Sequence, residues 1–379
     1  MKKFIKNHIP FLVMCFVLLL MIIFLIVMSV LQNNTQIAES WTRTFGRNYT
    51  KAMSQFNKNL PFSLTAFSFF VVLISCIFLL GWGFSLIGNK KVWPFIHRIM
   101  VICLIVVGTI TMYNASVGFA YHRAALELDG YVGEIKKEDF KAIATYFVED
   151  YNSCMNELGI DEKGELRMEY SYEDMIAKVR LEFNKLDNDY YSDTVAHPKA
   201  LATSGLFNTV GIVGMYFGVL GEVNYNTYAT NAELPFYITH ELCHSIGVMR
   251  EGDAQLLATY LLITSEDPLL RYSAYWNTIN RIIDITRLTD NKDDYKDVVN
   301  LISEDIWKNN QYIYNHWKNK DFLSQLGDQI NSWYLKTFGQ KNGTESYNDT
   351  PIEVDPGGQV ITLSNYQSIY FKIYYDNHI

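Results

Sequence analysis

Cysteine is scarce in this sequence, and an excess of positive charge is absent. Three of the five cysteines lie in long apolar runs, which leaves only Cys154 and Cys243 in the polar part of the 379-residue chain. One pair is too little for a disulfide framework, and we expect no disulfide. Acidic residues outnumber basic ones by 40 to 32, a net charge of −8. This balance argues against a nucleic-acid partner, because phosphate binding needs a basic surface.

Long apolar runs are what the first third of the chain does contain. The first run, residues 11–31, has 21 residues without a charge. At 1.5 Å per residue it reaches roughly 30 Å, enough to cross the hydrocarbon layer of a bilayer. The basic start at Lys2, Lys3 and Lys6 would also suit a signal peptide. The run is too long for one, however, and no small-residue cleavage site follows it. The pattern therefore predicts an uncleaved anchor.

Two further runs predict two more spans, at about residues 62–87 and 99–119. Together with the first they make a membrane domain over residues 1–120, and the lipid bilayer is an expected partner. The basic N-terminus and the linker before residue 99 favour the cytoplasmic side for both segments. An odd number of spans then places residues 121–379 outside the cytoplasm. The loop over residues 32–61 opposes this orientation, since it carries Arg43, Arg47, Lys51 and Lys58.

The polar part is mainly helical by its hydrophobic spacing. Residues 139–158 and 171–186 repeat apolar residues at steps of three and four, and a Ser-x-x-Asp cap opens the second segment. Residues 203–230 are rich in glycine, β-branched and aromatic residues, which predicts two or three short strands. A fourth span at 206–220 is the alternative, but it is too short and glycine-interrupted. More helices are expected from residue 234 to about 338, followed by a loop-like tail at 340–362. The fold class is therefore α+β.

The stretch from Leu234 to Ile246, "LPFYITHELCHSI", carries the chemistry. His240 and His244 are four residues apart, so on a helix they project from one face and can reach the same zinc ion. Glu241 lies beside the open position of that ion, where it can act as general base and acid. This is the H-E-x-x-H pattern of zinc peptidases. The alternative is an ordinary helix whose histidines are surface or core residues.

A catalytic zinc needs a third protein ligand. Position 250, where some zinc peptidases have a third histidine, is an arginine, which excludes that class. Glu251 opens the next helix, with Gln255 one turn later as a candidate supporting contact. Asp253 is the main alternative ligand. Either acid would also be favoured at a helix N-terminus by the helix dipole alone, and the spacing favours Glu251 as the ligand.

The chain resembles a bacterial multi-pass membrane family of unknown function, which in turn resembles the glutamate-type zincins (gluzincins). Three spans, "LPFS", "LGEVNYN", the H-E-x-x-H stretch with "REGDAQ", and "RYSAY" occur in that order. The resemblance implies a zincin-like domain with His240, His244 and Glu251 as zinc ligands and Glu241 as general base. The sequence departs from the common pattern at Gln255, where asparagine or aspartate is usual, and at Cys243, where alanine is frequent.

A zincin also pairs its extended substrate with a strand at a sheet edge. "GEVNYNTY" precedes the motif, and Glu222 and Asn224 are its candidate substrate-strand residues; an ordinary edge strand is the alternative. Nothing ranks the candidates for stabilising the oxyanion, among them His197, Arg271, Tyr272 and Tyr275.

The sequence predicts a membrane-anchored zinc metallopeptidase that hydrolyses peptides or proteins outside the cytoplasm of a bacterial cell. An intramembrane protease is disfavoured, because the motif stretch is short and is followed at once by charged residues. A non-catalytic membrane sensor with a zincin-like domain is the alternative. The substrate and the oligomeric state cannot be read from the sequence.

Overall fold

In the computed structural model, the chain divides into two compact units. The first comprises Met1–Ala124 together with Tyr216–Glu222, and the second comprises Ala125–Met215 together with Val223–Ile379. The short segment Tyr216–Glu222, far along the sequence, therefore belongs to the same unit as the N-terminal helices. The structure describes residues 2–88, 92–186, 189–192, 196–202, 204–209, 211–318, 329, 331–333, 335–337, 340, 342–347, 353–354 and 361–378.

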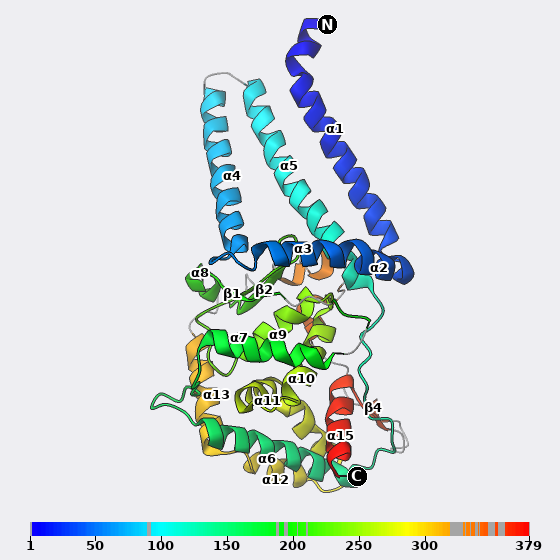
Figure 1. Ribbon diagram of the computed structural model, residues 1–379, viewed down its shortest axis with the longest axis vertical. Coiled ribbons are helices and arrows are strands. Elements are labelled where there is room, and N and C mark those ends of the chain that lie inside the picture. The colour runs from blue at the N-terminus through cyan, green and yellow to red at the C-terminus, as the bar shows by residue number, and fades with distance from the viewer. Residues whose placement is uncertain are drawn as a thin grey trace. The chain divides into compact units, whose positions relative to one another are not determined.

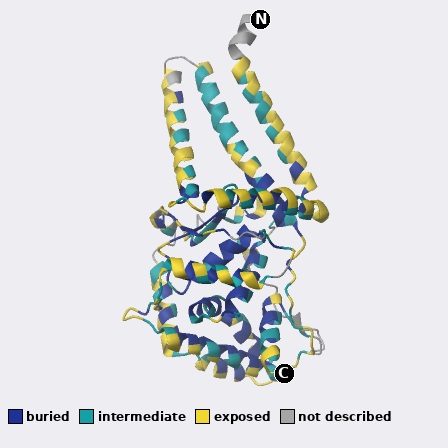
Figure 2. Ribbon diagram, viewed as in Figure 1, coloured by how far each residue is buried: buried dark blue, intermediate teal, exposed yellow. Residues whose placement is uncertain are grey.

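Three long apolar helices dominate the first unit, as the sequence predicts (Figure 1). Both outer helices pack on the third, and much of their remaining surface is apolar and exposed (Figure 2). The helices are α1 (Lys2–Leu31), α4 (Leu64–Gly88) and α5 (Val92–Ser116). Their stretches with the length and composition of membrane spans are Ile9–Leu31, Leu64–Ser85 and Val92–Ser116.

The third span begins seven residues earlier than the predicted start at residue 99. The charge of Arg98 suggested a boundary, but the arginine lies inside α5. Its Nη1 donates to the carbonyl of Pro94 at 2.6 Å, and its guanidinium lies 3.8 Å from the ring centre of Trp82. Because its charge has these two partners, Arg98 can lie inside the apolar helix α5 instead of marking where the helix begins. Lys90 and Lys91, two basic residues of the linker before residue 99, lie outside the described residues.

Shorter helices join the first two spans. α2 (Thr35–Trp41), a π-helical turn (Thr42–Gly46) and α3 (Arg47–Asn57) follow one another without a break. Asn34 caps α2, since its side-chain oxygen accepts from the backbone N–H groups of Gln36 and Ile37. After α5, a 3-10 helix over Gly118–His122 ends the unit's helical part.

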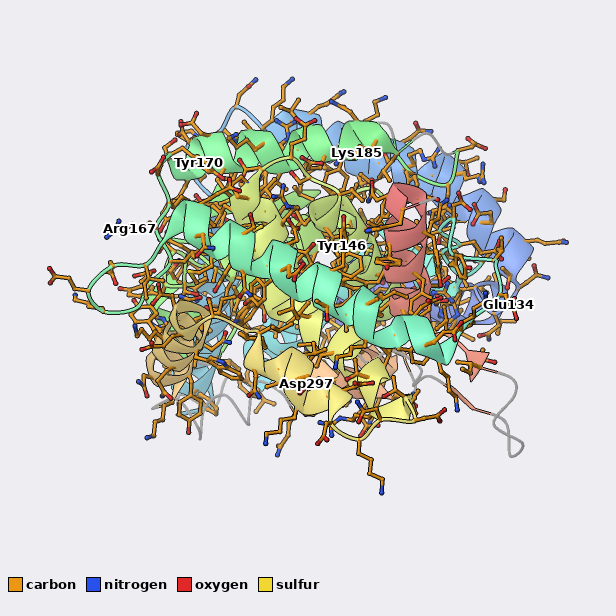
Figure 3. All side chains as sticks on the ribbon, turned by 90° about the horizontal axis from the view of Figure 1, so that it is seen from below. Glu134, Tyr146, Arg167, Tyr170, Lys185 and Asp297 are labelled. Atoms are coloured by element: carbon orange, nitrogen blue, oxygen red, sulfur yellow. The ribbon has the colours of Figure 1, made fainter. Side chains whose placement is uncertain are left out.

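The second unit is a helical layer structure around α11 (Pro268–Ile283), which packs on helices before and after it in the sequence. Figure 3 looks at α6 with Tyr146 near its middle, while Tyr170 and Lys185 mark the two ends of α7. The other helices are α6 (Phe140–Leu158), α7 (Tyr172–Glu182), α8 (Ser204–Thr209), α9 (Leu234–Ser245), α10 (Glu251–Ile263), α12 (Asp294–Asn300), α13 (Glu304–Trp317) and α15 (Asn365–His378), with 3-10 turns at Lys137–Asp139, Phe183–Lys185, Asp284–Leu288 and Gly343–Tyr347.

Several of these helices start where the sequence predicts. Ser171 caps α7, accepting from the backbone N–H of Asp174 at 3.1 Å. The α6 stripe, which includes Phe140, Ile143 and Phe147, is fully buried. The stretch 206–220, weighed as a fourth span, instead contains the end of α8, strand β2 and a turn. Most of the loop-like tail lies outside the described residues; within it, β4 (Glu353–Val354) pairs antiparallel with β5 (Ile361–Thr362).

The small sheet corrects one prediction about strand order. Its strands are β1 (Lys199–Ala200), β2 (Gly214–Phe217) and β3 (Glu222–Tyr225), in the order β1-β3-β2, with β1 parallel to β3. The segment "GEVNYNTY" was expected at the sheet edge, but β3 is the central strand and all four of its residues are buried. β3 has a neighbouring strand on each side, and β1 pairs with Asn224 and Tyr225, so β3 is not the edge strand that the prediction required.

The side chain of Glu222 explains why a charged residue is buried here. Its carboxylate accepts from the backbone N–H groups of Leu64 and Thr65, at 3.1 and 2.7 Å, and from the hydroxyl of Ser63 at 3.2 Å. These are the unpaired donors at the N-terminus of α4, where a negative charge is favourable. Glu222 therefore caps a candidate membrane span.

Candidate metal centre

α9, which carries the two histidines, is fixed at its N-terminus by side chains from other helices. The backbone N–H of Phe236 donates to the hydroxyl of Ser273 on α11 at 3.0 Å, and that hydroxyl donates to the carbonyl of Ala232 at 2.6 Å. The buried carboxylate of Glu233 accepts from the indole N–H of Trp317 at 2.9 Å. With Pro235 in its first turn and nearly every residue buried, α9 has little freedom to rotate.

The chain reverses direction directly after α9, at Gly247. This glycine has φ of +94°, a left-handed conformation that side chains disfavour. The backbone N–H of Val248 donates to the carbonyl of Cys243 at 3.1 Å, and that of Gly247 to the carbonyl of His244 at 3.0 Å, so the end of the helix is closed. Arg250 is extended, and α10 begins at Glu251. The reversal therefore turns the start of α10 back toward the histidines.

His240, His244 and Glu251 converge on one point. Glu251 Oε2 lies 3.0 Å from His240 Nε2 and 3.4 Å from His244 Nε2, and the three ligand atoms lie within 4.8 Å of one another. The imidazole rings are 4.6 Å apart at 85°. A tetrahedral ion with ligands at about 2.0–2.1 Å holds neighbouring ligand atoms roughly 3.4 Å apart. The three side chains thus fit a small divalent ion, with a corner left for a fourth ligand.

Burial and charge tie these three groups together. Burial raises the pKa of Glu251, but the nearby imidazoles of His244 and His240 outweigh it and hold that pKa far below its usual range. Burial lowers the pKa of His244, while the Glu251 carboxylate raises it to a net value of about 9. The Glu251 carboxylate thus favours the protonated form of His244 in the metal-free protein. A metal ion would displace that proton, because only the neutral imidazole is a ligand.

One outer contact of the histidines is a backbone group. His244 Nδ1 lies 2.8 Å from the carbonyl of Val248, on the reversal after α9. A proton on Nδ1 donated to that carbonyl leaves Nε2 facing Glu251 as the ligand atom, the arrangement common for metal-binding histidines. Sequence reasoning missed this contact because a carbonyl carries no residue-type signal. Gly247 was the available clue, since it marks the tight reversal that brings Val248 back.

Glu241 lies beside β2. A Cβ atom on Gly214 would lie 2.7 Å from Cγ of Glu241 and 3.1 Å from its Oε1, so only glycine fits next to this carboxylate. Glu241 does not belong to the converging ligand set. β2 is an edge strand of the sheet, in contrast to β3. The strand next to the predicted base is therefore the one that begins at Gly214, which the sequence did not single out.

The competing ligand, Asp253, is engaged elsewhere. Its Oδ2 accepts from Nε of Arg250 at 2.8 Å and from the backbone N–H of Leu126 at 3.3 Å. For Gln255, the structure shows only its backbone carbonyl as an acceptor, from the hydroxyl of Thr259, within the described part of the chain. Within the described residues, no contact therefore supports the predicted role of the Gln255 side chain in holding Glu251.

Three residues considered for the oxyanion have partners away from the ligands. The hydroxyl of Tyr272 donates to Asn309, and Tyr275 and Arg271 both donate to the carboxylate of Asp150. Cys243 is fully buried, and burial together with Glu241 raises the pKa of its thiol well above the usual value. A protonated, inaccessible thiol is a packing group, as expected for a position where alanine is common.

Comparisons with known proteins reach one family. The sequence profile described as "Protein of unknown function (DUF3810)" matches residues 41–352. This range contains two of the three apolar helices, the sheet and the whole ligand set. No curated protein and no solved structure matches the chain.

Proposed function

Since the chain belongs to the DUF3810 family of proteins of unknown function, we propose a function from its site: it is a membrane-anchored zinc metallopeptidase of the glutamate-zincin type. The observation that carries the proposal is that the ligand atoms of His240, His244 and Glu251 lie within 4.8 Å of one another. The predicted base, Glu241, directly follows His240 in the sequence. Two imidazoles and one carboxylate are the donor set of catalytic zinc in such peptidases, which keeps a fourth position for water.

Zinc bound there would polarise a substrate carbonyl and lower the pKa of a coordinated water to about 7. The protein's own contribution is proton transfer and positioning. The Glu241 carboxylate accepts the proton of the attacking water and then delivers it to the leaving amine as the peptide bond breaks. Burial of the ligands removes competing water and fixes their geometry. The edge strand β2, whose Gly214 touches Glu241, is the place where an extended peptide would pair.

The test is metal-dependent hydrolysis by the full chain in detergent or nanodiscs. We expect about one zinc per chain by elemental analysis, cleavage of a fluorescent casein, loss of cleavage with a chelator and recovery when zinc is restored. A chain that takes up no zinc in excess metal would overturn the proposal. Stoichiometric zinc without hydrolysis of any peptide library would instead favour the second candidate, a zincin-like membrane sensor.

We also propose that the second unit lies outside the cytoplasm of a bacterial cell. The basic N-terminus supports this orientation through the positive-inside rule, and three spans carry the chain across. An alkaline phosphatase fused after residue 125 should then be active, because this reporter folds only outside the cytoplasm. A fluorescent protein at the same position should be dark. The reverse pair of signals would invert the topology.

A further inference from the structure

An exposed aromatic stripe follows the helices that join the first two spans. Figure 1 shows α2 and α3 running crosswise at the ends of α1, α4 and α5. Phe45 is 42% exposed and Phe56 is 67% exposed. Eleven residues, or about three helical turns, separate them, so both project from the same side. Phe45 contacts the rings of Trp41 and Tyr49, with ring centroids 5.2 and 5.9 Å apart. The surface that both phenylalanines still leave exposed is apolar and favours a further partner.

α3 is held by the turn between β2 and β3. The hydroxyl of Ser54 donates to the carbonyl of Gly221 at 2.6 Å, and the hydroxyl of Tyr49 donates to the carbonyl of Val219 at 2.7 Å. Phe56 follows Ser54 by two residues, about 200° around the helix. These two hydrogen bonds therefore fix the rotation of α3. Phe56 points away from the Ser54 contact, while Tyr49, two turns before Phe56, lies on the same side as Phe56.

Gly46 shows on which side of this helix α5 ends. A Cβ atom there would lie 2.9 Å from the carbonyl of Ser116, at the end of α5. At about 100° per residue, Phe45 and Phe56 lie some 80–100° from Gly46 on the same flank. Asn48 and Gln55, both exposed, lie about 160–180° away from it. The aromatic flank is thus closer to the side of the helix that faces the end of α5. The polar flank lies on the side of the helix opposite to Gly46.

The apolar surface continues from this segment into the spans. Phe62, which is 48% exposed, makes an edge contact at 6.0 Å with Phe67, which is 56% exposed and lies in the second candidate span. At the other end, α2 begins four residues after α1 ends. A segment joined to two spans by such short turns stays at the depth where those spans leave the hydrocarbon.

The charge of this segment suits a lipid surface. Residues 32–61 contain four basic residues and one acid, Glu39, which gives a net charge of +3 (4 − 1). Glu39 pairs with Arg43 at 2.6 Å and with Arg123 at 2.7 Å. Lys58 is exposed and, two residues after Phe56, lies about 200° around the helix from it. Basic residues at this depth are attracted to anionic headgroups.

We propose that α2 and α3 form an interfacial helix that binds the surface of the membrane crossed by the spans. Phe45 and Phe56 insert at the boundary between headgroups and acyl chains, the depth that aromatic side chains favour. Lys51 and Lys58, which lie about 120–160° around the helix from these two rings, reach anionic phosphates from the other flank. The proposal concerns the membrane unit alone and is independent of any enzymatic activity.

The test is photocrosslinking with the full chain in nanodiscs of phosphatidylcholine and phosphatidylglycerol. p-Benzoylphenylalanine replaces one residue at a time, either Phe45 or Phe56, with Asn48 and Gln55 as matched exposed controls on the polar flank. We expect covalent lipid adducts by mass spectrometry at 45 and 56, with a several-fold lower yield at 48 and 55. Substitution of both Lys51 and Lys58 by glutamine should reduce the phosphatidylglycerol share of the adducts.

Three outcomes would overturn the proposal. Equal lipid yields at all four positions would mean that no particular flank faces the bilayer. Crosslinks from 45 and 56 to a second copy of the chain would identify the stripe as a protein interface. Absence of lipid adducts at 45 and 56, with adducts present at a control position such as Ile74 in the second span, would place the stripe in water.

Discussion

Replacing Glu241 with glutamine is expected to leave zinc bound and to slow peptide hydrolysis by about 10²- to 10⁴-fold, the usual contribution of a general base. Glutamine has the same shape, so it fits beside Gly214 as glutamate does. It cannot accept the proton of the attacking water. Since Glu241 lies outside the converging ligand set, the metal content should stay near one per chain. Elemental analysis and turnover of a fluorescent casein measure the two effects separately.

Two results would contradict this assignment in different ways. Turnover of Glu241→Gln within a few-fold of the wild type would show that another group takes the proton. Loss of zinc from the same variant would show that Glu241 helps to hold the metal. Thermal unfolding of both proteins in the same detergent controls for damage to the fold.

Replacing Glu251 with glutamine is expected to weaken zinc binding by more than the about 10- to 100-fold that loss of an outer contact costs. The carboxylate oxygen lies 3.0 and 3.4 Å from the two imidazole nitrogens, which is the distance between atoms that coordinate the same zinc ion. A neutral amide oxygen is a much poorer ligand for zinc. Competition titration with a zinc-binding dye gives the affinity directly.

Asp253→Asn is the matched control for this experiment. It also removes one acidic charge from the first turn of α10, but its carboxylate is bound to Arg250 and to the backbone of Leu126. Its zinc affinity should stay within a few-fold of the wild type. If Asp253→Asn loses the metal and Glu251→Gln retains it, the third ligand has been assigned to the wrong acid. His240→Ala removes a zinc ligand under either assignment, so its zinc affinity shows how large the loss of a true ligand is.

Much of the candidate site could be predicted because its information is local. The four-residue step between His240 and His244 sets two imidazoles on one helix face wherever a helix forms. Gly247 marks the end of that helix, and the structure uses it for a left-handed reversal. The choice between Glu251 and Asp253 needed the path of the chain after that glycine. The spacing favours Glu251 but leaves Asp253 open, because a spacing does not contain that path.

The order of the strands could not be predicted, because its cause lies far away in the sequence. Polar residues at alternate positions are typical of an exposed edge strand, and β3 has Glu222 and Asn224 in that pattern. In the fold, the carboxylate of Glu222 is satisfied by Ser63, Leu64 and Thr65, more than 150 residues earlier. A buried charge with a remote partner has the same local sequence as an exposed one.

The tight reversal at Gly247 also limits how this stretch can vary. Between the end of α9 and the start of α10 there are five residues, Ile246–Arg250. A single inserted residue there would shift the register of the carboxylate relative to the imidazoles by about 100° if it were added to α10. Insertions and deletions should therefore be selected against in this loop. The full pattern His-Glu-x-x-His-x-x-Gly-x-x-x-Glu is accordingly a sharper search string than its first five positions.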